Sequence, residues 1–353
     1  MNSGSRPGSA GPLDGYGDVR GLSVEKERLQ SATHDEILNG LTTDVYFVKA
    51  RDVLKKAGRL DTPVTAEIFA RKGGVFAGLD EVKLLLSGKA VELEALREGD
   101  EFSPREVVAR ITGPYGEFGM YETVLLGMFA SATSWATAAR ECVNAAEGKP
   151  VLCFGARHLH PAVAPVMERT AVVAGGCSGS SCILGARLAG AEPTGTVPHA
   201  AVLIVGDTVA LAKCYDAVMP EDDQRIVLVD TFKDEAEETL RVAEALGDRL
   251  SAVRLDTPGE RGGVSADLVR EIRCRLDLAG YSHVKIVASG GLNPDRIRDL
   301  GAAGADFFGV GSYIAHGATI DMTMDIKEID GLPVAKRGRL PGRIENHRLV
   351  RVK

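Results

Sequence analysis

The sequence predicts a two-domain α/β protein, in which an N-terminal α/β sandwich precedes an incomplete β/α barrel of about seven strands. A chain of 353 residues is longer than one typical domain and favours two. The pattern changes at Pro150: before it, short alternating strands lead into a long apolar helix, and after it strands, turns and helices alternate. Two glycine-rich turns, in 284–291 and 306–312, each follow an apolar run, as at the carboxyl ends of barrel strands.

The sandwich domain is expected to cover residues 36–148. Residues 1–35 are rich in Gly, Ser and Pro and then in charge, so they predict a disordered tail. A helical stretch begins at 44–47, and a long, largely buried helix is predicted over 118–146. Strands are predicted at 64–70, 75–76, 91–96 and 107–111. The basic, strand-like segment 325–353 is expected to return to this domain.

The barrel is expected to cover residues 149–324. Its strands are predicted at 151–154, 171–174, 192–196, 226–229, 252–255, 285–288 and 307–309, with helices between them that include 234–246 and 264–279. The fingerprint G-x-G-x-x-G, followed by an acidic residue about 20 positions later, is absent, which argues against a dinucleotide-binding fold.

Composition and charge exclude several classes of function. The net charge is −7, with one Trp and no basic stripe, so we expect no nucleic-acid partner. The six Cys show no C-x-x-C spacing, which indicates neither a zinc knuckle nor a disulfide framework and favours a cytoplasmic protein with reduced thiols. No run is long and apolar enough to cross a membrane, and the N-terminus lacks an apolar signal-peptide core, so we expect no membrane partner.

The two glycine-rich turns predict a phosphate site. Glycine lets backbone N–H groups approach a phosphate without interference from a Cβ, and a following helix N-terminus favours the negative charge. The residues expected to bind phosphate are Ser289, Gly290, Gly291, Gly309, Gly311 and Ser312. The chain is therefore expected to handle a phosphorylated small molecule.

Two acidic residues terminate neighbouring predicted strands. Asp230 follows 227–229 and Asp256 follows 253–255, so both carboxylates are expected to face one pocket. Such acids can hold ribose hydroxyls, bind Mg²⁺ together with phosphate oxygens, or stabilise a cationic sugar transition state. The alternative is that each caps the helix that follows it.

Two further loops that follow predicted strands contain arginine or histidine side chains. Arg157 can bind a carboxylate or a phosphate with both arms of its guanidinium. His158 and His160 form a His-x-His pair that can shape a substrate site, bind a metal or serve in packing, and no third metal ligand lies nearby in the sequence. Thr196 and His199 lie in another such loop, where a lone His at a helix start is either structural or part of the site.

Together these motifs resemble nicotinate phosphoribosyltransferase, a family of the type II phosphoribosyltransferase superfamily that also contains quinolinate phosphoribosyltransferase. The resemblance covers roughly residues 42–343. It is carried, in order, by Thr43-Asp44-Val45-Tyr46-Phe47, Phe154-Gly155-Ala156-Arg157, Gly175-Gly176, Gly179-Ser180-Ser181, Gly195-Thr196-x-x-His199, Val229-Asp230-Thr231, Arg254-Leu255-Asp256-Thr257, Ser289-Gly290-Gly291-Leu292 and Phe308-Gly309-Val310-Gly311-Ser312.

The resemblance implies transfer of a phosphoribosyl group from 5-phosphoribosyl-1-pyrophosphate to nicotinate, in NAD biosynthesis, often with ATP hydrolysis. It implies Mg²⁺ on the pyrophosphate near Asp230 and Asp256, without a cage of protein ligands. It also implies a homodimer or larger assembly with shared sites. Tyr46 and Phe47 would then reach a neighbouring subunit's pocket and stack on the pyridine ring; the alternative is that both belong to the sandwich core.

The resemblance assigns roles but leaves those of Arg157 and His199 open. Arg157 would bind the nicotinate carboxylate or the pyrophosphate, with His158 and Thr196 as further substrate-binding residues. His199 would accept a phosphoryl group from ATP or only shape the site. His158 stands where the longer nicotinate enzymes have a second Arg, and the short chain resembles a compact branch. The rival functions are decarboxylating quinolinate phosphoribosyl transfer and a non-catalytic barrel that binds phosphate or nucleotide.

Overall fold

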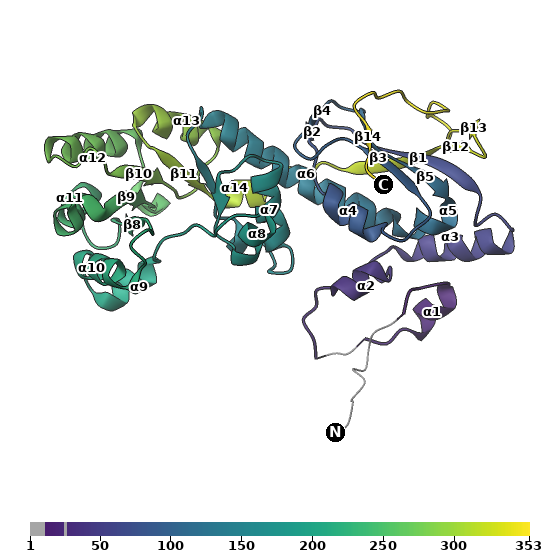
Figure 1. Cartoon of the computed structure of the whole chain (residues 1–353), viewed down its shortest axis with the longest axis horizontal. Helices are drawn as coiled ribbons and strands as arrows, with labels where there is room; N and C mark the ends of the chain where they lie inside the picture. The colour runs from purple at the N-terminus through teal and green to yellow at the C-terminus, as the bar shows by residue number, and fades with distance from the viewer. Residues whose placement is uncertain (1–10, 25–26) are drawn as a thin grey trace, which may run out of the picture. The chain divides into compact units, whose positions relative to one another are not determined.

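The computed structural model describes residues 11–24 and 27–353, and these form two compact units (Figure 1). We call Met1–Ser134 together with Thr319–Lys353 the sandwich unit, and Trp135–Ala318 the barrel unit. The division falls inside the long helix α6 (Glu122–Ala145), whereas the sequence pattern changes only at Pro150. The second half of α6 belongs to the barrel unit because Ala139, Cys142 and Ala145 lie in its core.

The sandwich unit is built on an antiparallel sheet of order β13-β12-β1-β5-β3-β14. Its strands are β1 (Pro63–Ala70), β3 (Glu92–Ala95), β5 (Val107–Pro114), β12 (Met322–Ile329), β13 (Leu332–Pro333) and β14 (Val350–Arg351), and β2 (Gly74–Val75) pairs separately with β4 (Glu101–Phe102). The helices are α1 (Tyr16–Gly21), α2 (His34–Leu38), α3 (Val45–Lys56), α4 (Leu79–Leu85), α5 (Tyr115–Phe118), η1 (Gly119–Tyr121) and the start of α6.

Strand β1 lies inside the sheet, with strands on both sides, and all seven of its residues after Pro63 are buried. It pairs with β5 on one side and with β12 on the other, so the chain returns to this sheet through β12. Part of the predicted tail 1–35 is ordered: the backbone N–H of Tyr16, at the start of α1, donates to Asp52 of α3 (2.8 Å). Residues 1–10 and 25–26 lie outside the described residues.

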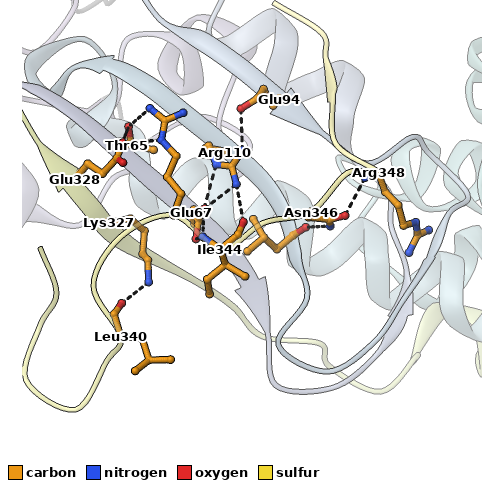
Figure 2. Close-up of polar contacts among 12 residues, drawn as sticks. Thr65, Glu67, Glu94, Arg110, Lys327, Glu328, Leu340, Ile344, Asn346 and Arg348 are labelled. Atoms are coloured by element: carbon orange, nitrogen blue, oxygen red, sulfur yellow. Dashed lines mark hydrogen bonds and ion pairs between the residues drawn. The ribbon is translucent and has the colours of Figure 1, made fainter. Parts of the chain in front are cut away.

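The C-terminal segment completes a buried polar cluster on this sheet (Figure 2). Arg110 and Glu67 form an ion pair (Nη2 to Oε1, 2.9 Å) with side-chain exposures of 9% and 1%. Ile344 donates its N–H to Glu67 (3.0 Å), and its carbonyl accepts from Arg110 (2.8 Å). A buried ion pair is tolerated only when its remaining polar atoms have hydrogen-bond partners. The backbone of Ile344 supplies such partners to both Glu67 and Arg110, and these bonds also attach the C-terminal segment to the sheet.

The barrel unit contains one parallel sheet of order β7-β6-β11-β10-β9-β8. The strands are β6 (Val151–Cys153), β7 (Gly179–Ser180), β8 (Arg225–Leu228), β9 (Leu250–Leu255), β10 (Lys285–Ala288) and β11 (Phe307–Val310). The helices are η2 (Ala156–His158), α7 (Ala164–Val173), α8 (Ile183–Leu188), α9 (His199–Val205), α10 (Thr208–Val218), α11 (Glu235–Leu246), η3 (Gly247–Arg249), η4 (Gly259–Arg261), α12 (Ala266–Leu278), α13 (Pro294–Ala303) and α14 (Ser312–Ala315).

The sheet is open, which confirms the incomplete barrel, but it has six strands rather than about seven. The predicted strand at 171–174 is wrong: it lies at the end of helix α7, because a short apolar run cannot by itself distinguish a strand from a buried helix. The predicted strand at 192–196 is also wrong, since this stretch has no regular structure. The edge strand β7 was missed because a Gly-Ser pair carries no strand preference.

The order of the strands brings the two glycine-rich turns together. Strands β10 and β11 are hydrogen-bonded neighbours, as the sequence predicted. Helices α10 to α13 pack against the sheet through Ala212, Val242, Ile272 and Ile297. Within the described residues, no helix is long and apolar enough to span a membrane.

Candidate active site

The carboxyl edge of the parallel sheet gathers the predicted site residues of the barrel unit. Asp256 directly follows β9, Ser289 directly follows β10, and Gly311 directly follows β11. Asp230 lies two positions after β8. Because all six strands are parallel, these residues lie at the same edge, where α/β folds place their ligands.

Arg254 links the ends of β9 and β10 to the irregular segment before α9. This residue of β9 donates from Nε to Ser289 Oγ (2.9 Å), from Nη1 to Thr196 Oγ1 (3.1 Å) and from Nη2 to Asp256 Oδ2 (3.2 Å). Its guanidinium also lies over the ring of Phe154, 5.2 Å from the centroid. Only an arginine offers several donors in one rigid fork, so Arg254 fixes the relative positions of these segments.

Asp256 is fully engaged by this network. One carboxylate oxygen accepts from Arg254, and the other lies 2.8 Å from the hydroxyl of Ser289. The alternative that Asp256 caps a following helix does not hold, because Pro258 is the N-cap of η4 and Ser265 caps α12. The structure therefore places Asp256 in the arrangement at the strand ends, with its charge balanced by Arg254.

Asp230 is the more deeply buried of the two carboxylates. Its side chain is 1% exposed, and Oδ2 lies 3.0 Å from His199 Nε2. Its Oδ1 is buried and has no hydrogen-bond partner within the described structure. Burial raises the pKa of Asp230, and the hydrogen bond from His199 opposes that rise. Asp230 does not cap a helix either, since Asp234 caps α11.

His199 is the first residue of α9, but its side chain does not cap that helix. The ring reaches across to Asp230 from a different segment. A carboxylate acceptor at Nε2 favours the tautomer that carries its proton there, which leaves the lone pair on Nδ1. The pair Asp230–His199 therefore has the composition of a general acid–base or nucleophilic unit.

Further buried polar atoms without partners lie beside the same strands. Within the described part of the chain these include Ser180 Oγ at the end of β7 and Thr231 Oγ1 after β8, in addition to Asp230 Oδ1. Buried polar groups nearly always have partners, so such a group beside a strand end is one that a ligand or water would satisfy.

The residues fit a magnesium ion that is shared with substrate. Mg²⁺ is commonly held by one or two carboxylates together with substrate phosphates, and Asp230 Oδ1 is a carboxylate oxygen without a partner. Among the described residues, no group of three or more His, Cys, Asp or Glu side chains could hold a metal ion. The Nδ1 atom of His160 accepts a hydrogen bond from the backbone N–H of Ala162 (3.1 Å), so this nitrogen is used within its own loop.

The first glycine-rich turn needs glycine for its backbone. Gly290 and Gly291 have φ of +87° and +63°, the left-handed region that other residues rarely adopt. A Cβ on Gly290 would also lie 3.2 Å from Asp256 Oδ1. This turn is therefore an open backbone loop directly beside the Asp256 carboxylate.

The second turn needs glycine for a different reason. A Cβ on Gly309 would lie 2.6 Å from the ring of Phe154, and one on Gly311 would lie 2.9 Å from His158 Nε2. Neither residue has a positive φ. Close packing of the loop after β6 thus explains these two glycines, and Ser312 begins the short helix α14 beside them.

Arg157 and His158 lie in η2, immediately after β6. Arg157 is exposed and forms no hydrogen bond or ion pair within the described residues. His158 is half-buried, with its ring edge-on to that of His316 at 5.8 Å. Burial, and then the charge of Arg157, lower the pKa of His158, which favours the neutral imidazole.

Tyr46 and Phe47 belong to helix α3 of the sandwich unit. Phe47 is buried, whereas Tyr46 is 59% exposed, and their rings lie 4.4 Å apart. The alternative that both are core residues therefore holds for Phe47 only. The expectation that they reach a neighbouring subunit's pocket stays a prediction.

The sequence reasoning missed Arg254, although it named the motif that contains it. A signal was present: side chains alternate along a strand, so Arg254 shares its face with Asp256 two positions later. It also missed Phe154 and Glu168 as supporting residues. Glu168 had no such signal, because it lies on α7 rather than at a strand end, and its contacts with the two flanking loops depend on how that helix packs.

Comparison with known proteins agrees with this arrangement. Residues 44–133 match the family described as quinolinate phosphoribosyl transferase, N-terminal domain, and residues 135–325 match its C-terminal domain. A nicotinate phosphoribosyltransferase of Mycobacterium tuberculosis is 29% identical over 343 residues, covering 84% of this chain and 74% of that protein.

Solved structures resemble the chain as well, and two of them illustrate the range of identity. The nicotinate-nucleotide pyrophosphorylase from Pyrococcus furiosus is 44% identical, with a TM-score of 0.85, over 90% of this chain and 82% of its own. Human nicotinic acid phosphoribosyltransferase shares the fold at 19% identity, with a TM-score of 0.68, over 85% of this chain and 77% of its own. With both domains matched in order along one chain, this protein belongs to the quinolinate phosphoribosyl transferase family and is a phosphoribosyltransferase.

Proposed function

We propose that this chain transfers the phosphoribosyl group of 5-phosphoribosyl-1-pyrophosphate to nicotinate, giving nicotinate mononucleotide and pyrophosphate in NAD biosynthesis. The observation that carries the proposal is the unpaired, buried Oδ1 of Asp230, at the same sheet edge as the two glycine-rich turns. The relative from M. tuberculosis is named a nicotinate phosphoribosyltransferase, which supports this choice of substrate.

The reaction needs stabilisation of positive charge more than a strong base. Displacement of pyrophosphate from ribose C1 passes through an oxocarbenium-like centre, which a nearby carboxylate stabilises. Asp230 would supply this charge, while Asp256, neutralised by Arg254, would accept ribose hydroxyls and keep Ser289 in place. A magnesium ion held through Asp230 would neutralise the leaving pyrophosphate.

The rest of the site would bind the substrates. Ser289–Gly291 and Gly309–Ser312 would hold the 5-phosphate through backbone N–H groups. Arg157 would bind the carboxylate of nicotinate, because its guanidinium is exposed and free of other ion pairs within the described residues. Arg157 is exposed, whereas Arg254 is paired with Asp256, which favours a monocarboxylate over the dicarboxylate quinolinate, whose second charge would need a further cation.

We further propose that ATP is coupled to the reaction through His199. With its Nε2 proton donated to Asp230, Nδ1 would attack the γ-phosphorus of ATP, forming an N–P bond as ADP leaves. The protein is also proposed to be a cytoplasmic homodimer or larger assembly, in which Tyr46 reaches a neighbouring site.

The test is product formation from labelled nicotinate or quinolinate with 5-phosphoribosyl-1-pyrophosphate and Mg²⁺, with and without ATP. Wild-type protein should convert nicotinate, and Asp230→Asn should lose about 10²–10³-fold in turnover. Asp234→Asn, which changes a helix cap close by, is the matched control and should keep its turnover.

Three outcomes would contradict parts of the proposal. Release of CO₂ from quinolinate would assign the decarboxylating activity instead. Folded protein that converts neither acid would leave a non-catalytic phosphate-binding barrel. If γ-labelled ATP leaves no acid-labile label on wild type, or an equal label on His199→Ala, then His199 does not carry the phosphoryl group.

A further inference from the structure

Helix α7 carries a carboxylate in the interior of the barrel unit. The side chain of Glu168 is fully buried. Its Oε1 accepts from the N–H of Ala156 (2.9 Å) and lies 3.3 Å from Ser181 Oγ, and its Oε2 accepts from the N–H of Cys182 (2.5 Å). Within the described part of the chain, Glu168 forms no ion pair, so these three donors alone stabilise the charge.

The three donors come from two different strand-end loops. Ala156 follows β6 and immediately precedes Arg157. Ser181 and Cys182 follow β7, immediately after Ser180, whose buried hydroxyl has no partner among the residues that the structure describes. One carboxylate therefore joins the loop that presents Arg157 to the loop that presents the Ser180 hydroxyl.

The position of Glu168 is fixed from the opposite side as well. A Cβ on Gly185, in α8, would lie only 3.0 Å from the Cβ of Glu168, so α8 packs directly on this residue. Burying a carboxylate without a cation costs several kcal/mol before its hydrogen bonds offset it, and an apolar residue would avoid that cost. Packing therefore does not explain the acid, but the joining of two loops does.

We propose that Glu168 is a positioning residue that holds the loops after β6 and β7 in one arrangement, so that Arg157 and Ser180 face the same ligand. The inference rests on the proposed function, in which that ligand is the aromatic acid substrate. Glu168 touches no substrate itself. Its effect on affinity passes through the backbone of Ala156 and the segment that begins at Ser181.

The amide variant Glu168→Gln tests this assignment. Its NH₂ group places a donor against one of the N–H donors, so one loop is released while size is kept. We expect KM for nicotinate to rise about tenfold or more, as for loss of a supporting hydrogen bond to a binding residue, with KM for 5-phosphoribosyl-1-pyrophosphate unchanged. The shorter Glu168→Asp keeps the charge but cannot span both loops, and it should not restore KM.

The matched control is Glu238→Gln. Glu238 is also a fully buried carboxylate on a helix of the barrel unit, but its partner is Arg241 of the same helix. A purely structural role predicts that both variants lower the melting temperature and the active fraction without changing KM for nicotinate. An unchanged KM in Glu168→Gln, or full rescue by Glu168→Asp, would overturn the inference while leaving the proposed function intact.

Hydrogen exchange provides a readout that does not depend on turnover. In Glu168→Gln the amides of 155–158 and of 180–183 should both exchange faster, and those near Glu238 should not. If the wild type converts neither acid, the proposed function fails. Hydrogen exchange alone then tests whether Glu168 joins the two loops. Faster exchange in both segments then supports it, and exchange as in wild type in either segment overturns it.

Discussion

Replacing Arg254 by Lys should impair the enzyme although the positive charge remains. The guanidinium makes hydrogen bonds to Ser289, Thr196 and Asp256 at 2.9, 3.1 and 3.2 Å, each from a different nitrogen. A lysine ammonium is a point charge on a flexible stem, and it cannot reach all three acceptors with this spacing. The expected first contact of the lysine is the carboxylate of Asp256, because that partner is charged.

The magnitude follows from the two bonds that are lost. The side chains of Arg254 and Asp256 are 19% and 24% exposed, so their ion pair is only partly screened and the lysine retains much of it. The bonds to the hydroxyls of Ser289 and Thr196 are lost, at about 1–1.5 kcal/mol each. The sum of about 2–3 kcal/mol corresponds to a fall of roughly 30- to 150-fold in kcat/KM.

The assay is steady-state kinetics at varied 5-phosphoribosyl-1-pyrophosphate, with thermal unfolding measured on the same samples. Arg249→Lys is the control, because Arg249 is 52% exposed and pairs with Asp216 away from the strand-end network. If Arg254→Lys keeps kcat/KM within about twofold of wild type while Arg249→Lys does the same, the guanidinium does not organise the site. A fall in melting temperature without a fall in kcat/KM would refute the reasoning equally.

Three further predictions concern stability. Burial, and then Asp325, raise the pKa of Glu122 from 4.5 to about 7, so the stability that it contributes is present below pH 4.5 and lost as pH rises through about 7. In urea unfolding, Glu122→Gln should therefore raise the free energy of unfolding by about 1–2 kcal/mol above pH 7, after allowance for partial exposure. Near pH 4 it should leave the free energy of unfolding unchanged. The pKa of Asp230 is raised too, so Asp230→Asn should melt higher than wild type at pH 7 despite its loss of turnover, and the difference should vanish below pH 3.8. A lower melting temperature of the variant at pH 7 would contradict this. Gly309→Ala should lower the melting temperature more than Gly291→Ala does. The first variant places a Cβ 2.6 Å from the ring of Phe154, whereas the second only strains the backbone, by about 1–2 kcal/mol. Equal melting temperatures of the two variants would count against the packing argument.

Local patterns predicted the regular strands well. The strands β8 to β11 carry continuous apolar runs with turn residues at their ends, and all four were predicted at their positions within about two residues. The two failures, at 171–174 and 192–196, are segments whose composition fits more than one state. Ala171 is buried because it lies on the same face of α7 as Met167, one turn earlier, and Ala164, two turns earlier, which a four-residue window does not reveal.

The candidate site shows a similar division. Motif spacing predicted that Asp230, Asp256 and Ser289 lie at strand ends, and the parallel strand order brings these ends to one edge. The spacing did not indicate that Asp256 is neutralised by Arg254 while Asp230 keeps an unpaired oxygen. Nor did it distinguish the backbone requirement at Gly290 from the packing requirement at Gly309.

The sequence by itself determined the α/β class, the incomplete barrel, the family and the strand ends that carry the polar residues, because hydrophobic period and turn chemistry are local properties of the chain. Only the tertiary structure decided which of these residues meet. Hydrogen-bond partners such as His199 and Asp230, or Glu168 and Cys182, lie on different segments, and their pairing depends on how the strands are ordered and the helices packed. Burial and the partners of each charged group, and hence its pKa, follow from that packing and have no signature in a local stretch of sequence.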